Sequence, residues 1–210
     1  MITIPFSKAR HDARRAFTLL EILVVVLIIA LMVAILTPPL LNVMEASRLT
    51  QTGQGLMFRV SMAQQTALSE NRPVELRFFH YTDDNGAQGY HASQLYYYDE
   101  VAEDGASLES PHYFSLGVMI PDSPLAPLLA GLVEDAPAAD REPFLSLEAR
   151  YRGIVFYPDG STSINAPLRD AYVTLCSTRA VVEDGETPPS NYFTIQIDPV
   201  NGSTKSYRPN

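Results

Sequence analysis

The sequence predicts an α+β protein in which one long N-terminal helix packs on a mostly antiparallel β-sheet body. Two patterns along the 210 residues support this fold class. Near the N-terminus, apolar residues first form a continuous run and then recur with a helical period as far as Asn71. Beyond Asn71, apolar residues alternate with polar ones, and turn-forming residues separate the alternating stretches. The length fits one folded body plus an anchor better than two large domains.

The first 16 residues form a short basic leader. Residues 1–16 carry more basic than acidic side chains, although the whole chain has a formal net charge of −9. The remainder is therefore strongly acidic. Phosphate binding needs a basic patch, and none is visible beyond the leader, so nucleic acid is not expected as a partner.

An apolar segment follows the leader from Phe17 to Leu41. Within it, every residue from Ile22 to Leu36 is apolar, and Glu21 is the only charged residue of the segment. A helix needs about 20 residues to cross the ~30 Å hydrocarbon core of a membrane, a length that Phe17 to Leu36 supplies only if Glu21 is included. We therefore predict a transmembrane helix segment over residues 17–41.

Glu21 is the unusual feature of this segment. A carboxylate inside a membrane helix costs on the order of a few kcal/mol, so such a residue is a functional candidate whose partner should be named. A cleavage just before Phe17 would create an α-amino group one helical turn from Glu21, a rise of about 6 Å. The amine and the carboxylate would then neutralise each other, within one subunit or between neighbours.

Residues Arg14 to Glu21, RRAFTLLE, followed by the apolar run, resemble the cleavage and methylation motif of type IV prepilins. The resemblance implies that a membrane prepilin peptidase cuts between Ala16 and Phe17 and methylates the new N-terminal amine of Phe17. It also implies that Glu21 acts in assembly. The family usually has glycine before the cleaved bond, where this chain has Ala16.

Two other interpretations of this N-terminus compete with a prepilin. A secretory signal peptide needs a cleavage site with small residues after the apolar run, but Thr37-Pro38-Pro39 follows the run and Met44-Glu45-Ala46 places a large residue where a small one is needed. An uncleaved signal anchor would explain the basic leader through the positive-inside rule, but it would not explain Glu21.

The helix is predicted to continue beyond the membrane over residues 42–71. Pro38 and Pro39 remove backbone donors, so they should kink the helix at the outer edge of the membrane. Gly53 and Gly55 should weaken it locally. A coiled coil is the alternative, but fewer than four clean heptads are present. The predicted helix places its apolar positions on one face: Leu49, Leu56, Val60, Ala63 and Ala67.

Residues 72–210 are predicted to form a β-rich extracytoplasmic domain. Alternating or β-rich stretches predict strands at Pro73–Phe78, Gln94–Tyr98, Phe114–Ile120, Ile154–Tyr157, Tyr172–Cys176 and Phe193–Ile197. Turn residues predict hairpins at Asp84-Asn85-Gly86, Pro158-Asp159-Gly160 and Asn201-Gly202, the last leading to a short strand near Lys205–Arg208. A proline-rich insertion at residues 121–143 is expected to be a loop with a short helix, and it is a candidate partner contact.

The order of elements in this body also carries a resemblance. A long helix followed by strands, with Phe156 to Ser161 before a late strand and a closing Asn-Gly hairpin, resembles the minor pseudopilin H subunit of type II secretion. Residues 64–78 are similar to the D-type proteins of the Verru_Chthon cassette. Both resemblances imply a minor subunit near a filament tip.

Few residues suggest chemistry. No two of the four histidines have metal-ligand spacing, although His80 and His91 could meet across a hairpin. There is no Gly-x-Ser-x-Gly elbow and no glycine-rich phosphate loop. We therefore predict no catalytic residues, no metal and no cofactor, and a protein that is not an enzyme. The histidines are His11, His80, His91 and His112.

Three further features keep alternatives open. The acidic clusters Asp83-Asp84-Asn85 and Asp99-Glu100 with Glu103-Asp104 offer oxygen ligands for calcium, but neither matches an EF-hand loop. Tyr96-Tyr97-Tyr98 is either an interface or part of the core. Cys176 is the only cysteine, so an intramolecular disulfide is excluded and a buried strand position is expected.

Together these features predict a structural subunit of a type IV pilus-like or type II secretion filament. The expected partners are prepilin peptidase, other pilin-like subunits and inner-membrane lipid, with no small-molecule substrate. The chain should cross the inner membrane once, with the leader cytoplasmic and the C-terminal domain periplasmic. The main alternative is a membrane-tethered binding module that forms no filament. An extracytoplasmic hydrolase is a more distant one, which would need a catalytic dyad in a pocket.

Overall fold

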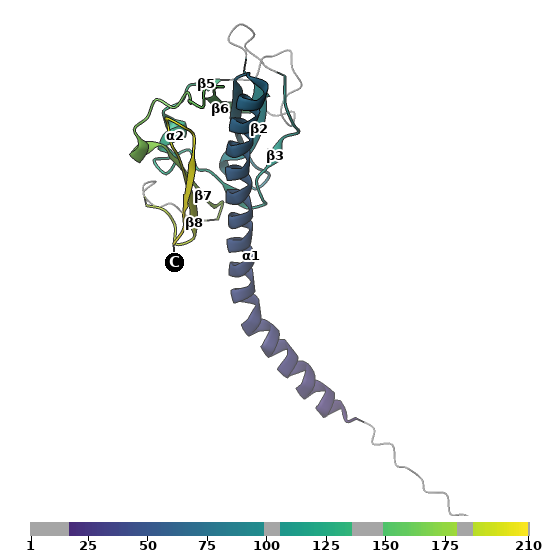
Figure 1. Cartoon of the computed structure of the whole chain (residues 1–210). Coiled ribbons are helices and arrows are strands. Elements are labelled where there is room, and N and C mark those ends of the chain that lie inside the picture. Colours follow the sequence, from purple (N-terminus) through teal and green to yellow (C-terminus); the bar gives the residue numbers. More distant parts are fainter. Residues whose placement is uncertain (1–16, 99–105, 136–148, 180–186, 210) are drawn as a thin grey trace, which may run out of the picture. The chain divides into compact units, whose positions relative to one another are not determined.

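The computed structural model describes residues 17–98, 106–135, 149–179 and 187–209, without the side chains of residues 36–42 (Figure 1). The chain divides into two compact units, Met1–Asn42 and Val43–Asn210. The predicted leader therefore lies outside the described residues, as does the last part of the predicted insertion.

One helix, α1 (Leu19–Glu70), runs through the end of the first unit and the beginning of the second. It ends at Asn71, whose φ of 50° is a left-handed conformation that terminates helices, and the N–H of Arg72 donates to the carbonyl of Ala67 (3.3 Å). The helical backbone continues through Pro38 and Pro39, and the kink expected there stays a prediction. Among the described residues, no helix contains a stretch both apolar and long enough to cross a membrane.

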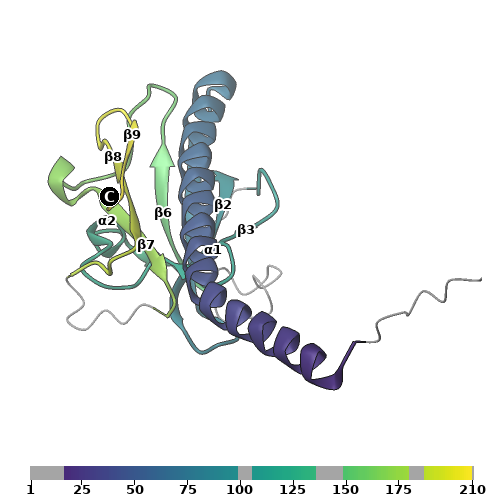
Figure 2. The same ribbon diagram turned by 90° about the horizontal axis from the view of Figure 1, so that it is seen from below.

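The second half of α1 packs on the β-sheets of the second unit, which confirms the predicted α+β class. Figure 2 shows β2 and β3 on one side of this half of the helix and β7, β8 and β9 on the other. The five predicted apolar positions from Leu49 to Ala67 are all buried, with at most 1% of each side chain exposed. They join residues of both sheets in one core cluster. The predicted apolar face of the helix is therefore confirmed.

Two antiparallel sheets make up the β structure that the described residues form. The first has the strand order β3-β2-β1-β6-β5, and the second has the order β4-β7-β8-β9. The strands of the first sheet are β1 (Val74–Thr82), β2 (Gln88–Tyr97), β3 (His112–Tyr113), β5 (Glu134–Asp135) and β6 (Arg150–Phe156). Those of the second are β4 (Val118–Met119), β7 (Tyr172–Ser177), β8 (Tyr192–Ile197) and β9 (Thr204–Tyr207), and a short 3-10 helix, η2 (Leu168–Asp170), precedes β7.

Two of the three predicted hairpins join neighbouring strands. β1 pairs with β2 across a turn in which Gly86 has φ 84°, and β8 pairs with β9 across a turn in which Gly202 has φ 67°. Both conformations favour glycine. The third predicted hairpin, at Asp159, is short: the turn is closed by an isolated antiparallel bridge between Phe156 and Thr162 and joins no second named strand.

The strand predicted over residues 114–120 forms only in part, as β4. The chain forms β3 before this stretch and β4 within it, and the two strands belong to different sheets. A turn separates them, in which the N–H of Val118 donates to the carbonyl of Ser115 (2.9 Å) and Gly117 has φ 82°. The apolar alternation reflects burial of Phe114, Val118 and Ile120 rather than extended backbone.

The insertion forms the predicted short helix, α2 (Pro127–Ala130), but the helix does not offer a free surface. Leu128 is 1% exposed and Leu129 is fully buried, and both belong to the core shared with α1. These two leucines are therefore core residues, and the role of the insertion as a partner contact stays a prediction. Residues 136–143 of the insertion lie outside the described part of the chain.

Candidate assembly and processing site

Thr18 fixes the beginning of α1. Its carbonyl accepts hydrogen bonds from the N–H groups of Glu21 (3.1 Å) and Ile22 (3.2 Å), and its Oγ1 lies 3.2 Å from the nitrogen of Glu21. A threonine that accepts from the N–H three residues later is the first half of a capping box, in which glutamate is the preferred third residue. The sequence interpretation missed Thr18, although the spacing Thr-x-x-Glu carries this signal.

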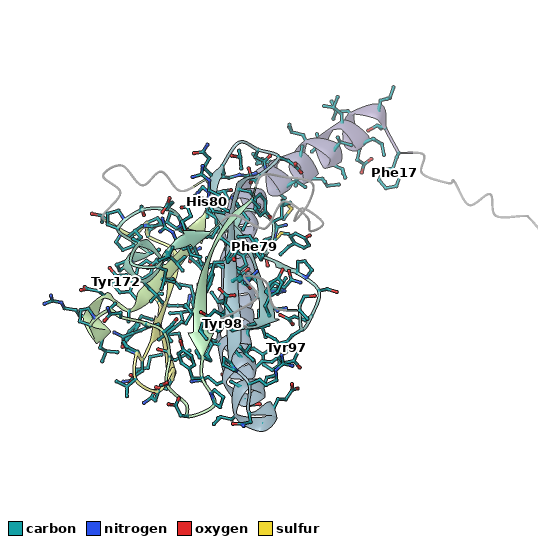
Figure 3. All side chains as sticks on the ribbon, turned by 90° about the horizontal axis from the view of Figure 1, so that it is seen from above. Phe17, Phe79, His80, Tyr97, Tyr98 and Tyr172 are labelled. Carbon is teal, nitrogen blue, oxygen red and sulfur yellow. The ribbon has the colours of Figure 1, made fainter. Side chains whose placement is uncertain are left out.

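The described side chains that follow the cap are all exposed. Phe17 is 72% exposed, Leu19 is 91% exposed, and every described residue as far as Ile35 is exposed as well. Figure 3 shows Phe17 at the beginning of α1 and side chains projecting on all sides of the helix segment after it. A helix that is apolar all round needs an apolar environment or a protein partner, because its surface exceeds what a soluble monomer exposes.

Glu21 lies in the first turn of this apolar segment, and its side chain is exposed. Phe17 directly precedes the capping residue, so an α-amino group created at Phe17 would stand at the N-terminus of α1. Ala16 lies outside the described residues. The processing site and the assembly role of Glu21 therefore stay predictions at this stage.

Comparison with known families decides the nature of this N-terminus. Residues 12–37 match the family model described as the prokaryotic N-terminal methylation motif. The N-terminal segment therefore carries the methylation motif of prepilin-type proteins. The matched range contains Phe17 and Glu21 together with most of the apolar run. A search of curated proteins finds no match to this chain.

Solved structures similar to this chain include those of two proteins. The minor pseudopilin EpsH from the type 2 secretion system of Vibrio cholerae has 9% identity and a TM-score of 0.39, over 77% of this chain and 97% of EpsH. The type IV minor pilin FimU of Pseudomonas aeruginosa has 9% identity and a TM-score of 0.40, over 78% of this chain and 90% of FimU. The assignment of the N-terminal motif rests on the family model and not on these similarities.

The two histidines considered as a metal pair lie on different faces of the first sheet. His80 pairs with Tyr90 in the β1–β2 register, and its ring lies 5.1 Å from the ring of Tyr90. His91 is the next residue of β2, so its side chain points to the opposite face, where its ring lies 5.1 Å from that of Tyr81. The two imidazoles therefore do not meet across the hairpin as proposed from the sequence.

The acidic cluster at the β1–β2 turn has a local structural role. Asp83 Oδ1 accepts hydrogen bonds from the N–H groups of Asn85 (2.9 Å) and Ala87 (2.8 Å). These bonds outweigh the effect of burial and lower the pKa of Asp83. Within the described residues, no group of three or more histidine, cysteine or acidic side chains could hold a metal ion. The second acidic cluster, residues 99–104, lies outside the described part.

The three consecutive tyrosines and the cysteine have contacts within the domain. Tyr97 packs on the core, its hydroxyl donates to Glu70 (2.5 Å), and the guanidinium of Arg72 lies 4.2 Å from its ring centroid. Figure 3 labels Tyr97 and Tyr98 beside the end of α1. Cys176 is fully buried in β7, and burial raises its pKa to about 11. The predicted strand position of Cys176 is confirmed.

Proposed function

We propose that this chain is a minor structural subunit of a type IV pilus-like or type II secretion filament. The methylation motif over residues 12–37 carries the proposal, because this motif marks subunits that are processed at the membrane and then assembled. The all-round apolar segment after Phe17 supports it, since such a segment needs lipid before assembly and other subunits afterwards.

Processing would take place at the bond between Ala16 and Phe17. Prepilin peptidase would remove the basic leader on the cytoplasmic side and methylate the new amine of Phe17. The capping bonds of Thr18 support this site, because α1 begins at Leu19, two residues after Phe17, and the bond before Phe17 lies outside the helix.

Assembly would use the carboxylate of Glu21. In an apolar environment a lone carboxylate is costly, and the α-amine of Phe17 in the same or a neighbouring subunit is the opposite charge nearest in sequence. Before assembly, the chain would lie in the inner membrane through residues 17–41, with the β-rich domain in the periplasm. In this role the chain would be a structural protein and not an enzyme.

Mass spectrometry of the mature protein from a host with prepilin peptidase tests the proposal. We expect a chain that begins with methylated Phe17, and the same product from the variant Ala16→Gly, which restores the residue usual in the family. The variant Ala16→Leu should keep the leader, because a large side chain replaces a small one at the cleaved bond. An intact Met1 leader in the unmodified chain, or a cut after Ala46, would refute the proposal.

A further inference from the structure

A cleft of about 380 Å³ lies at one end of the first sheet, on a part of the molecule that the proposed function does not use. Three segments line it: residues 81–85 at the end of β1 and in the turn after it, His91 of β2, and residues 113–118 between β3 and β4. All of these residues belong to the second unit. The cleft is therefore formed within one domain.

Hydrogen bonds hold the walls of the cleft in place. The loop wall is tied to α1, because the N–H of Ser115 donates to Thr52 Oγ1 (3.1 Å), and to β2, because the N–H of Phe114 donates to the carbonyl of His91 (2.8 Å). On the opposite wall, Asp83 caps the turn through the N–H of Ala87 (2.8 Å). A cleft whose walls are fixed before binding loses little conformational entropy when a ligand enters.

Aromatic side chains line part of the cleft, and one side of its rim carries exposed apolar residues. Tyr81 and Tyr113 both line the cleft, and the ring of His91 lies against that of Tyr81. Leu116 on the rim is 74% exposed and Tyr113 is 46% exposed. A leucine exposed to this degree beside an aromatic cleft adds apolar area that a bound side chain would cover.

The charge in the cleft is negative. Its lining includes Asp83 and Asp84, and the described lining residues include no lysine or arginine. Burial lowers the pKa of His91, so its imidazole is neutral at pH 7 and does not offset the carboxylates. Burial and the neighbouring Tyr113 are the main causes that raise the pKa of Tyr81 to about 12, and Asp83 and Asp84 add to this effect. The cleft therefore favours a cation.

We propose that this cleft binds an arginine side chain of a partner protein, with the guanidinium near the Asp84 carboxylate and its plane on the tyrosine rings. The same domain already holds arginines in this way: the guanidinium of Arg77 lies 4.2 Å from the ring centroid of Tyr96 and 4.3 Å from that of Tyr151. A planar guanidinium stacks on aromatic rings, whereas a lysine ammonium is more strongly hydrated and has no plane to stack. The proposal does not depend on filament assembly.

Binding of a short peptide to the full-length chain in detergent micelles tests this proposal. The probe is acetyl-Gly-Arg-Gly-amide, and the matched control replaces arginine with citrulline, which keeps the shape and removes the charge. In ¹⁵N-resolved NMR spectra we expect the arginine peptide to shift the amide signal of Gly117 saturably. The citrulline peptide should leave that signal in place. The corresponding peptide with lysine in place of arginine should bind more weakly than the arginine peptide.

Two variants locate the binding in the cleft. Asp84→Asn and Tyr113→Leu should each weaken the arginine peptide by about fivefold, and Asp170→Asn, which removes an exposed carboxylate elsewhere, should have no effect. The amide spectrum of each variant establishes that it is folded. The absence of a saturable shift would overturn the proposal. Equal binding of the lysine peptide, or equal weakening by Asp170→Asn, would also overturn it, since either result indicates general attraction to an acidic surface.

Discussion

Gly53 of α1 lies directly against the ring of Phe193 in β8. A Cβ atom at position 53 would come within 2.5 Å of the ring carbon Cδ1, a distance at which one of the two groups must move. Phe193 is 3% exposed and belongs to the core, so its ring has little room to move. Close contact between the second half of α1 and the second sheet therefore requires glycine at this position.

The variant Gly53→Ala should destabilise the domain by about 1–2 kcal/mol. Overpacking in a filled core costs roughly 1–3 kcal/mol, and the better helix propensity of alanine returns up to about 1 kcal/mol. Urea unfolding of the full-length protein in detergent, followed by circular dichroism, measures the difference. Gly55→Ala is the matched control, because its Cβ would lie 3.3 Å from Nε2 of the half-buried His112 ring, which can shift. Equal effects of the two variants would contradict this role of Gly53.

Much of the fold could be predicted because its signals are local. The spacing of apolar residues from Leu49 to Ala67 identified the buried face of α1, and the turns at Gly86 and Gly202 identified two hairpins. Gly53 shows the limit of such signals. In the sequence, Gly53 is recognisable only as a weak helix former. Its contact with Phe193 cannot be predicted, because Phe193 lies 140 positions later and nothing near Gly53 in the chain indicates it.

The division into two sheets could not be predicted for a similar reason. The alternation of apolar and polar residues from Phe114 to Ile120 is typical of a strand, but it does not indicate which strand will pair with each end of the stretch. The candidate site was more accessible, because the motif around Phe17 and Glu21 is contiguous in the chain. The capping role of Thr18 has an equally local signal, because the spacing Thr-x-x-Glu lies within one turn of the helix.

The partly buried ion pair between Arg59 of α1 and Glu109 joins the helix to the segment before β3. Their side chains are 14% and 19% exposed, and burial lowers the pKa of Arg59. We expect Glu109→Gln to cost about 2 kcal/mol, because it leaves a largely buried guanidinium without an opposite charge. Urea unfolding of the full-length protein measures this loss.

Two controls separate the buried charge from a general loss of packing around this pair. The double variant Arg59→Leu with Glu109→Leu should recover much of the loss, because it removes both charges. Asp170→Asn, which breaks the exposed pair with Arg169, should change stability by less than about 0.5 kcal/mol. A double variant less stable than Glu109→Gln would count against the explanation.

The stability of the domain should fall as the pH is lowered through the histidine range. Burial is the main cause that lowers the pKa of both His91 and His112. In the unfolded chain these groups bind protons near their usual pKa of about 6.5, so below that pH the unfolded state holds more protons than the native state. The contribution of these two neutral histidines to stability is therefore fully present above about pH 6.5, and it is lost as the pH falls toward their lower native pKa.

Unfolding at pH 7.5 and pH 5.5 measures this dependence. The double variant His91→Gln with His112→Gln should show a smaller loss between the two values, and the glutamine at position 91 keeps a donor for the carbonyl of Ala87 that the His91 ring contacts. Asp83 and Glu134, whose pKa values are lowered, respond at more acidic pH and do not affect the comparison. An unchanged pH dependence in the double variant would show that other groups cause the loss.

Replacement of Glu21 should separate membrane insertion from assembly. The variant Glu21→Gln keeps the size of the side chain and removes its charge, so insertion should be unchanged or better. If the carboxylate pairs with the amine of Phe17 in a low-dielectric environment, its loss costs more than about 1.4 kcal/mol, and incorporation into filaments should fall by roughly tenfold or more. Quantitative immunoblotting of membrane and sheared filament fractions measures both effects. Thr18→Ser keeps the hydroxyl at the helix N-terminus and should assemble normally. Normal incorporation of Glu21→Gln would exclude the charge pair as the basis of assembly.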